Sequence, residues 1–183
     1  MRKNERFPEP LITPSTKAEQ GVHDEPISRD EIQSRGIVDK DVWEKIEKAA
    51  LALFKRGTEV AGRQGLILVD TKYEFGLADG KLHVADEIHT QDSSRYWYKD
   101  TYEELFSHGQ DQRKLDKEFF RKWLMEHDYM GDGVPPEITD DVKRGITDRY
   151  KKAFHIITGS AFVPSGLTEE EELQKIAGAL TSL

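Results

Sequence analysis

Two long stretches of the chain repeat their hydrophobic residues at helical spacing. Between residues 40 and 64, apolar side chains return every three or four positions, and Gly65 follows the last of them. The second stretch covers residues 139–158, with Thr139 placed to cap its start and Gly159 to end it. The pattern therefore predicts two amphipathic helices. Three shorter helices are predicted at residues 28–36, 116–126 and 168 onward, the first and last opened by the capping boxes Ser28 to Glu31 and Thr168 to Glu171.

The hydrophobic period changes to two residues after Gly65. Residues 66–69 form a continuous apolar run, which is typical of a buried strand. Polar and apolar positions then alternate over residues 70–77, a turn follows at Asp79 and Gly80, and residues 81–86 alternate again. This order predicts an antiparallel β-hairpin. The polar stretch 89–114 is expected to be irregular.

The predicted fold class is α+β, a small antiparallel sheet with a β-hairpin packed by several helices. Residues 1–27 hold four of the seven prolines and are expected to be an extended segment. Residues 28–162 are expected to form one domain. Residues 163–183 are expected to be a tail with a short helix.

Composition excludes several classes of function. The net charge of −8 and the absence of a run of five Lys or Arg residues argue against a protein that mainly grips nucleic acid. The chain has no cysteine, which rules out disulfides, Cys-bound zinc and thiol catalysis. Its apolar runs are too short for a membrane span, and its start lacks the apolar core of a signal peptide. A cytoplasmic location is expected.

Charged residues gather where the predicted strands end. Asp70, Lys72 and Glu74 follow one another at two-residue spacing, so they would share one face of a strand, and Asp86 closes the return strand. Such a face can simply meet water. Carboxylates beside a lysine also suit Mg²⁺-nucleotide chemistry, because Mg²⁺ binds one or two carboxylates together with phosphate oxygens. The magnesium hypothesis favours a three-residue hairpin loop at 78–80, since a two-residue loop would turn Asp86 to the other face.

Several motifs together resemble the SAICAR synthase (phosphoribosylaminoimidazole-succinocarboxamide synthase) family. The resemblance runs in order from about residue 7 to residue 162. Its strongest stretches are D-T-K-Y-E-F-G at 70–76, D-E at 86–87 and D-S-S-R-Y-W at 92–97. Further similar stretches are P-E-P-L-I-T-P-S-T-K-A-E-Q-G-V-H-D-E at 8–25, L-D-K-E-F-F-R-K-W-L at 115–124 and I-T-G-S at 157–160.

The resemblance implies an ATP-dependent ligase of de novo purine biosynthesis. It implies that the extended segment 1–27 contains a substrate loop and that residues 28–162 form the domain that binds ATP and substrate. Such enzymes join L-aspartate to carboxyaminoimidazole ribonucleotide and release SAICAR, ADP and phosphate, with ATP and Mg²⁺ as cofactors. Matching positions imply magnesium binding by Glu74 and Asp86, and catalytic roles for Asp70 and Lys72. They also imply nucleotide or substrate binding by Ser15, Thr16, Lys17, His23, Asp24, Asp92, Ser94, Arg95, Lys117 and Arg121.

The chain departs from the family pattern at its front. Family members carry a glycine-rich nucleotide loop in an N-terminal region, and neither G-x-G-x-x-G nor G-x-x-x-x-G-K occurs here. The chain is therefore expected to be the C-terminal part of such an enzyme, complemented by the missing region or by a partner chain. Gln91 stands where proline is common in the family. Two alternatives stay open: a non-catalytic or split-enzyme assembly module, and a kinase-like phosphotransferase. A homo-oligomeric state also stays open.

Overall fold

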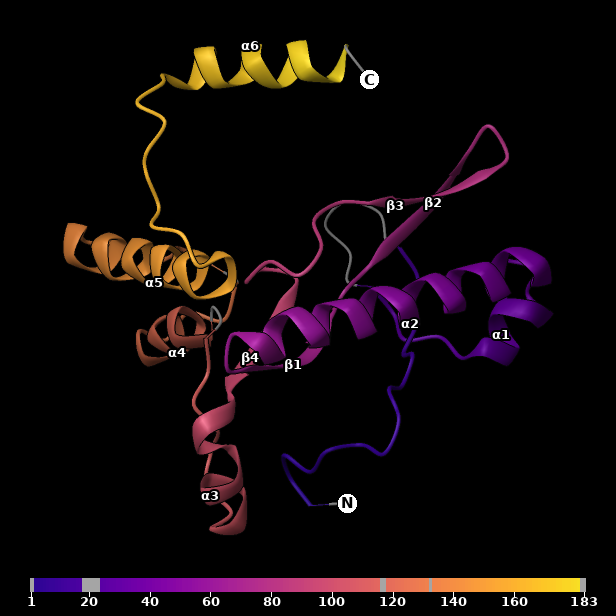
Figure 1. The fold of residues 1–183 in the computed structure, drawn as a ribbon, viewed down its shortest axis with the longest axis horizontal. Coiled ribbons are helices and arrows are strands. Elements are labelled where there is room, and N and C mark those ends of the chain that lie inside the picture. Colours follow the sequence, from indigo (N-terminus) through magenta and orange to yellow (C-terminus); the bar gives the residue numbers. More distant parts are fainter. Residues whose placement is uncertain (1, 18–23, 116–117, 132, 182–183) are drawn as a thin grey trace.

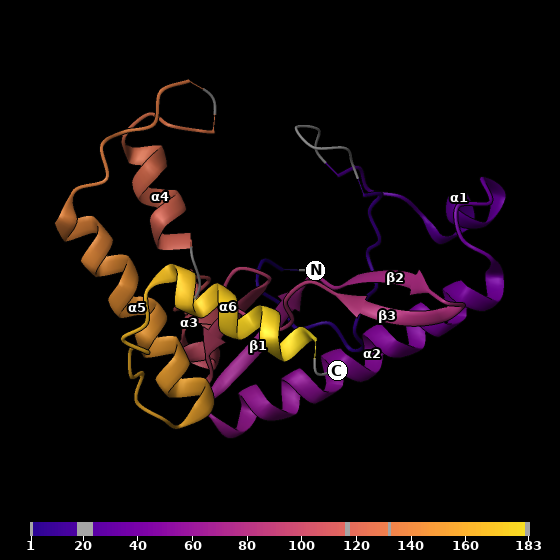
Figure 2. The same cartoon turned by 90° about the horizontal axis from the view of Figure 1, so that it is seen from above.

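The fold is α+β, as the sequence pattern predicts, and is built from helices around two small antiparallel sheets (Figure 1). The computed structural model describes residues 2–17, 24–115, 118–131 and 133–181. The long helix α2 (Lys40–Arg63) lies alongside the sheets, with α1 (Arg29–Ser34) at one end of the molecule. The helices α4 (Glu118–Glu126) and α5 (Asp140–Thr158) lie at the other end, as the view from above also shows (Figure 2).

Local capping interactions define several helix ends. The backbone amide of Glu31 donates to Ser28 Oγ at 3.2 Å and that of Ser28 donates to Glu31 Oε2 at 2.9 Å, which confirms the first capping box. The same arrangement opens α6 (Glu169–Leu180) at Thr168. Gly159 ends α5 with a left-handed φ of 72°, a conformation that glycine adopts without a Cβ clash. Among the described residues, no helix combines the length and apolar character that crossing a membrane requires.

The first sheet pairs β1 (Leu66–Thr71) with β4 (Ser94–Tyr98), and Leu66 lies opposite Tyr98. The expectation of an irregular stretch at 89–114 is therefore wrong. That stretch contains β4, the short 3₁₀ helix η1 (Lys99–Thr101) and the helix α3 (Tyr102–Ser107). Pairing with the apolar strand β1 supplies backbone hydrogen bonds and a buried face. The sequence of β4 alone does not predict this pairing.

The second sheet is the predicted hairpin of β2 (Glu74–Ala78) and β3 (Lys81–Ala85). Ala78 pairs with Lys81, so the loop has two residues, and the three-residue loop favoured by the magnesium hypothesis is wrong. The two loop residues, Asp79 and Gly80, have φ of 52° and 72°. Positive φ at both central residues is the turn geometry that Asp-Gly favours and that matches the twist of paired strands.

The main core joins α2, the first sheet and α5. Its buried residues are Ala61, Leu66, Leu68, Tyr96, Leu115 and Ala153. A smaller core of Ile27, Ile32 and Trp43 fixes α1 against the start of α2. Because β1 is anchored in the main core, the chain that leaves it toward β2 starts from a rigid point. Lys72 and Glu74 lie on that chain.

Candidate functional site

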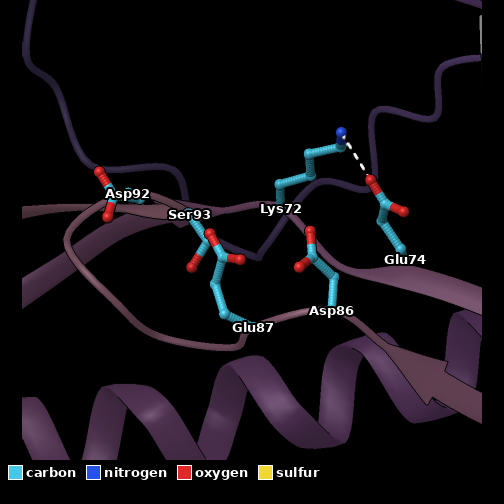
Figure 3. Close-up of a pocket in the computed structure, with 6 residues that line it drawn as sticks. All are labelled: Lys72, Glu74, Asp86, Glu87, Asp92 and Ser93. Carbon is cyan, nitrogen blue, oxygen red and sulfur yellow. Dashed lines mark ion pairs between the residues drawn. The ribbon is translucent and has the colours of Figure 1, made fainter. Parts of the chain in front are cut away.

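A polar cavity lies between the β1–β2 connection and the segment 86–93, which joins β3 to β4 (Figure 3). Its volume is about 270 Å³. The lining residues are Lys72, Glu74, Asp86, Glu87, Asp92 and Ser93. Four of them carry carboxylates, and the lysine supplies the positive charge within the lining. The cavity therefore brings together residues from both chain segments in which the sequence places charged residues at the ends of the predicted strands.

Asp86 reaches this cavity through its backbone conformation. Glu74 pairs with Ala85, so strict strand alternation would turn Asp86 to the face opposite Glu74. Asp86 follows the last residue of β3, however, and its φ of 64° is left-handed. That conformation breaks the alternation, and the carboxylates of Asp86 and Glu74 line the same cavity (Figure 3). Asp86 and Glu74 thus line one cavity, even though the hairpin register that was expected to bring them together is wrong.

Two lysines neutralise Glu74. Lys17 Nζ lies 2.5 Å from Glu74 Oε2, and Lys72 Nζ lies 2.9 Å from Glu74 Oε1. Lys72 Nζ is also 3.4 Å from Asp24 Oδ2. The hydrogen bonds from Lys17 and then Lys72 hold the pKa of Glu74 below its ordinary value, while the bond to Glu74 raises the pKa of Lys72. The expected substrate-loop residues Lys17 and Asp24 are thereby connected to the cavity.

The donor set of the cavity suits a magnesium ion that arrives with a nucleotide. Within the described part of the chain, no group of three or more His, Cys, Asp or Glu side chains is arranged to hold a metal by itself. A Mg²⁺ bound to phosphates needs only one or two protein carboxylates and completes its shell with water. Glu74 and Asp86 meet that smaller requirement, because both are oxygen donors on one cavity.

The β1–β4 ladder holds three other residues that the resemblance marks as functional. Arg95 Nε donates to Asp70 Oδ1 at 2.8 Å and to Oδ2 at 3.0 Å, across the directly opposed pair of strand residues. Ser94 is 4% exposed and its Oγ donates to Thr71 Oγ1 at 2.9 Å. None of these side chains is among the six that line the cavity. The hydroxyl of Ser94 therefore serves the ladder.

Three further expected site residues lie on the N-terminal segment and on α4. Ser15 forms an isolated β-bridge with Pro26, and the amide of Thr16 donates to the carbonyl of Glu25 at 2.9 Å. This pairing brings Lys17 back toward the cavity. Arg121 is exposed on α4. His23 and Lys117 lie outside the described residues.

Tyr150 is a site residue that the sequence pattern did not reveal. It lies on α5, and its hydroxyl donates to Asp92 Oδ1 at 2.8 Å. Burial, followed by the bond to Asp92, raises the pKa of Tyr150 to about 12. In the sequence Tyr150 is one member of an apolar helical stripe, and no local signal separates it from the others. Fifty-eight residues separate the bonded pair.

Comparison with known proteins gives one consistent answer. The sequence model of the family described as SAICAR synthetase matches residues 1–137. The phosphoribosylaminoimidazole-succinocarboxamide synthase of Bacteroides thetaiotaomicron is 55% identical over 165 residues, which are 89% of this chain and 52% of that protein. The enzyme of the same name from Cytophaga hutchinsonii is 46% identical over 178 residues, covering 96% of this chain and 57% of the relative.

Solved structures agree with the sequence relatives. The SAICAR synthase of Saccharomyces cerevisiae in complex with SAICAR has a TM-score of 0.71 and 30% identity, over 89% of this chain and 51% of that chain. A SAICAR synthetase in complex with ADP has a TM-score of 0.61 and 28% identity, over 86% and 55%. The chain spans about half the length of the relatives it matches. With the family model covering well over half of its residues, the chain belongs to the SAICAR synthetase family.

Proposed function

We propose that this chain supplies the magnesium-binding and part of the substrate-binding surface of an ATP-dependent ligase. The ligase joins L-aspartate to carboxyaminoimidazole ribonucleotide and gives SAICAR, ADP and phosphate. The observation that carries the proposal is the convergence of Glu74, Asp86 and Lys72 on one cavity in a chain of this family. Relatives whose structures contain SAICAR or ADP support the binding of small molecules of these two kinds.

The chemistry explains why such a cavity is needed. A carboxylate is a poor acyl donor, and phosphoryl transfer from ATP makes it an acyl phosphate that the aspartate amine can attack. Bound Mg²⁺, held by Glu74 and Asp86, would neutralise phosphate charge during that transfer. Lys72 lies beside both the cavity and Glu74, so it can offset further negative charge on the nucleotide. Catalysis of this kind rests mainly on positioning and charge neutralisation.

The other proposed residues orient the substrates. Asp92 lines the cavity and accepts a hydrogen bond from Tyr150, so one of its oxygens has a fixed direction. Lys17 and Asp24 reach the cavity residues Glu74 and Lys72 from the N-terminal segment, so both can contact a bound substrate. Arg95 is held by Asp70, and an anionic substrate group must therefore compete with that carboxylate to bind it.

A chimeric enzyme tests the proposal. This chain replaces the matching segment of the Bacteroides thetaiotaomicron relative, with which it is 55% identical, and ADP and SAICAR formation are measured. We expect turnover that requires both L-aspartate and the ribonucleotide. Asp86→Ala should lower kcat by about a hundredfold or more while the circular dichroism spectrum is retained. Glu44→Ala removes an exposed carboxylate on α2 and should leave the rate unchanged.

Three results would contradict the proposal. A folded chimera that forms no SAICAR would favour the non-catalytic module. ADP release that does not depend on aspartate would favour the kinase-like alternative. Full activity in the Asp86→Ala variant would remove the metal-binding role. The module and kinase alternatives are not favoured, because the relatives quoted above carry the name of the ligase.

A further inference from the structure

The segment 86–93 carries four of the six residues that line the cavity, yet it has no regular secondary structure along most of its length. Two of its residues, Asp86 and His89, have positive φ, at 64° and 59°. A left-handed conformation at residues other than glycine persists where the surrounding structure holds it in place. The structure around His89 therefore bears on how the cavity carboxylates are aimed.

Two tyrosines hold His89 from the sheet side. The hydroxyl of Tyr73, between β1 and β2, lies 2.6 Å from His89 Nε2 and shares a hydrogen bond with it. The two rings meet edge to face, with centroids 5.5 Å apart. The hydroxyl of Tyr96, on β4, donates to the backbone carbonyl of His89 at 2.7 Å. The side chain of His89 is thus bonded to a residue next to the strands, and its backbone to a residue within β4.

The ring of His89 also packs closely against helix α2. A Cβ added to Gly57 would lie 2.6 Å from His89 Cε1 and Nε2, and 2.8 Å from Leu68 Cδ2. Contacts this short do not occur, so the ring occupies the space where any other residue would place its side chain. Glycine is unfavourable inside a helix because it adds backbone freedom to the unfolded chain. The approach of the His89 ring gives a physical reason for Gly57 in the middle of α2.

A second anchor lies two residues further along the segment. Gln91 is 7% exposed, and its Nε2 donates to the backbone carbonyl of Leu115, a residue of the main core. Gln91 and His89 together fix the middle of the segment. The cavity residues Asp86 and Asp92 flank these two anchors.

We propose that His89 is a positioning residue. It is clamped by its contacts with Gly57 and Tyr73, and it orients the carboxylates of the segment 86–93 toward the cavity. It acts through the segment and does not touch substrate. The role rests on the proposed function, because it concerns the same cavity. Burial lowers the pKa of His89 and raises that of Tyr73 to about 12, so both groups are uncharged at neutral pH and keep their hydrogen bond.

Variants on three different elements test the clamp in the chimeric enzyme. Tyr73→Phe removes only the hydroxyl, His89→Leu removes the ring nitrogens, and Gly57→Ala forces the ring away from α2. Gly62→Ala is the matched control, because Gly62 lies on the same helix as Gly57 and a Cβ added there would meet nothing within 4 Å. His89→Gln is the conservative variant, since its amide reaches toward the position of Nε2.

Three measurements are made on each variant: kcat, the Mg²⁺ concentration for half-maximal rate, and the rise in unfolding temperature on adding Mg²⁺ with a non-hydrolysable ATP analogue. We expect Tyr73→Phe, His89→Leu and Gly57→Ala to lower kcat and raise the Mg²⁺ requirement, each by about fivefold or more, and to reduce the temperature rise. His89→Gln should recover most of the loss, and Gly62→Ala should behave as the parent.

An unchanged kcat and an unchanged Mg²⁺ requirement in a folded Tyr73→Phe protein would overturn the proposal. If His89→Leu or Gly57→Ala fails to fold, the nearly isosteric Tyr73→Phe variant still tests the positioning role. Loss of stability with an unchanged Mg²⁺ requirement would also overturn it, because that is the result of a purely structural role. Failure of the proposed function is distinguishable: the parent chimera would then be inactive, whereas failure of the clamp leaves an active parent and active variants.

Discussion

The Ser94→Ala substitution separates a structural hydroxyl from a substrate ligand. The resemblance assigns Ser94 to substrate binding, whereas the structure buries it in the β1–β4 ladder at 4% exposure. Its Oγ donates to Thr71 Oγ1 at 2.9 Å, and the hydroxyl of Ser93 lies 3.3 Å away. Removing the hydroxyl should therefore weaken the pairing of the two strands and leave substrate binding intact.

The expected loss follows from the kind of hydrogen bond. A neutral, buried hydroxyl bond contributes about 0.5–1.5 kcal/mol, and an acceptor left without a partner adds to the loss when water cannot reach it. Thr71 is only half-buried, so water can replace the lost donor and the addition is small. We expect Ser94→Ala to lower the free energy of unfolding by about 1 kcal/mol. For a chain of this size that corresponds to a fall of about 2–4 °C in Tm.

Urea denaturation followed by tryptophan fluorescence measures the stability change, and kinetics of the chimera give the KM for the ribonucleotide. Ser160→Ala, at an exposed position after α5, is the control for both. A structural role for the hydroxyl is refuted if Ser94→Ala retains the stability of the parent while the KM for the ribonucleotide rises about tenfold, equivalent to about 1.4 kcal/mol of lost binding. That result would place the hydroxyl on substrate.

Three further predictions concern ion pairs and a hydrogen bond in or near the cavity. The lowered pKa of Glu74 contributes stability that is fully present above its ordinary pKa and is lost as the pH falls through the lowered value, so Lys17→Met should move acid unfolding, followed by circular dichroism, to higher pH. Tyr150→Phe should raise the KM for the ribonucleotide by about threefold to tenfold with little change in Tm, and an unchanged KM would show that its bond to the cavity carboxylate does not orient substrate. A double-mutant cycle of Asp70→Asn and Arg95→Met should give a coupling free energy of about 0.5–1 kcal/mol in unfolding experiments, because both side chains are about half exposed. A coupling of zero would show that water competes fully with this ion pair and that it does not stabilise the fold.

Local interactions made several elements predictable from the sequence. The capping boxes at Ser28 and Thr168 need only residues three positions apart, and Gly159 ends α5 through its own backbone freedom. The hairpin follows from alternation around Asp79 and Gly80. Glu74 and Asp86 could be named as cavity residues because they belong to motifs that carry the family resemblance.

The sequence by itself determined the helices other than η1 and α3, the hairpin and two acids of the cavity, since each depends on near neighbours or on a short motif. Only the tertiary structure decided the β4 strand, the two-residue hairpin register, the left-handed aim of Asp86 and the contact of Tyr150 with Asp92. Apart from the hairpin register, which is set within residues 74–85, these features depend on chain segments that are distant in sequence and meet when the core forms. Their energies come from pairing and packing across that distance, which no local pattern of residues records.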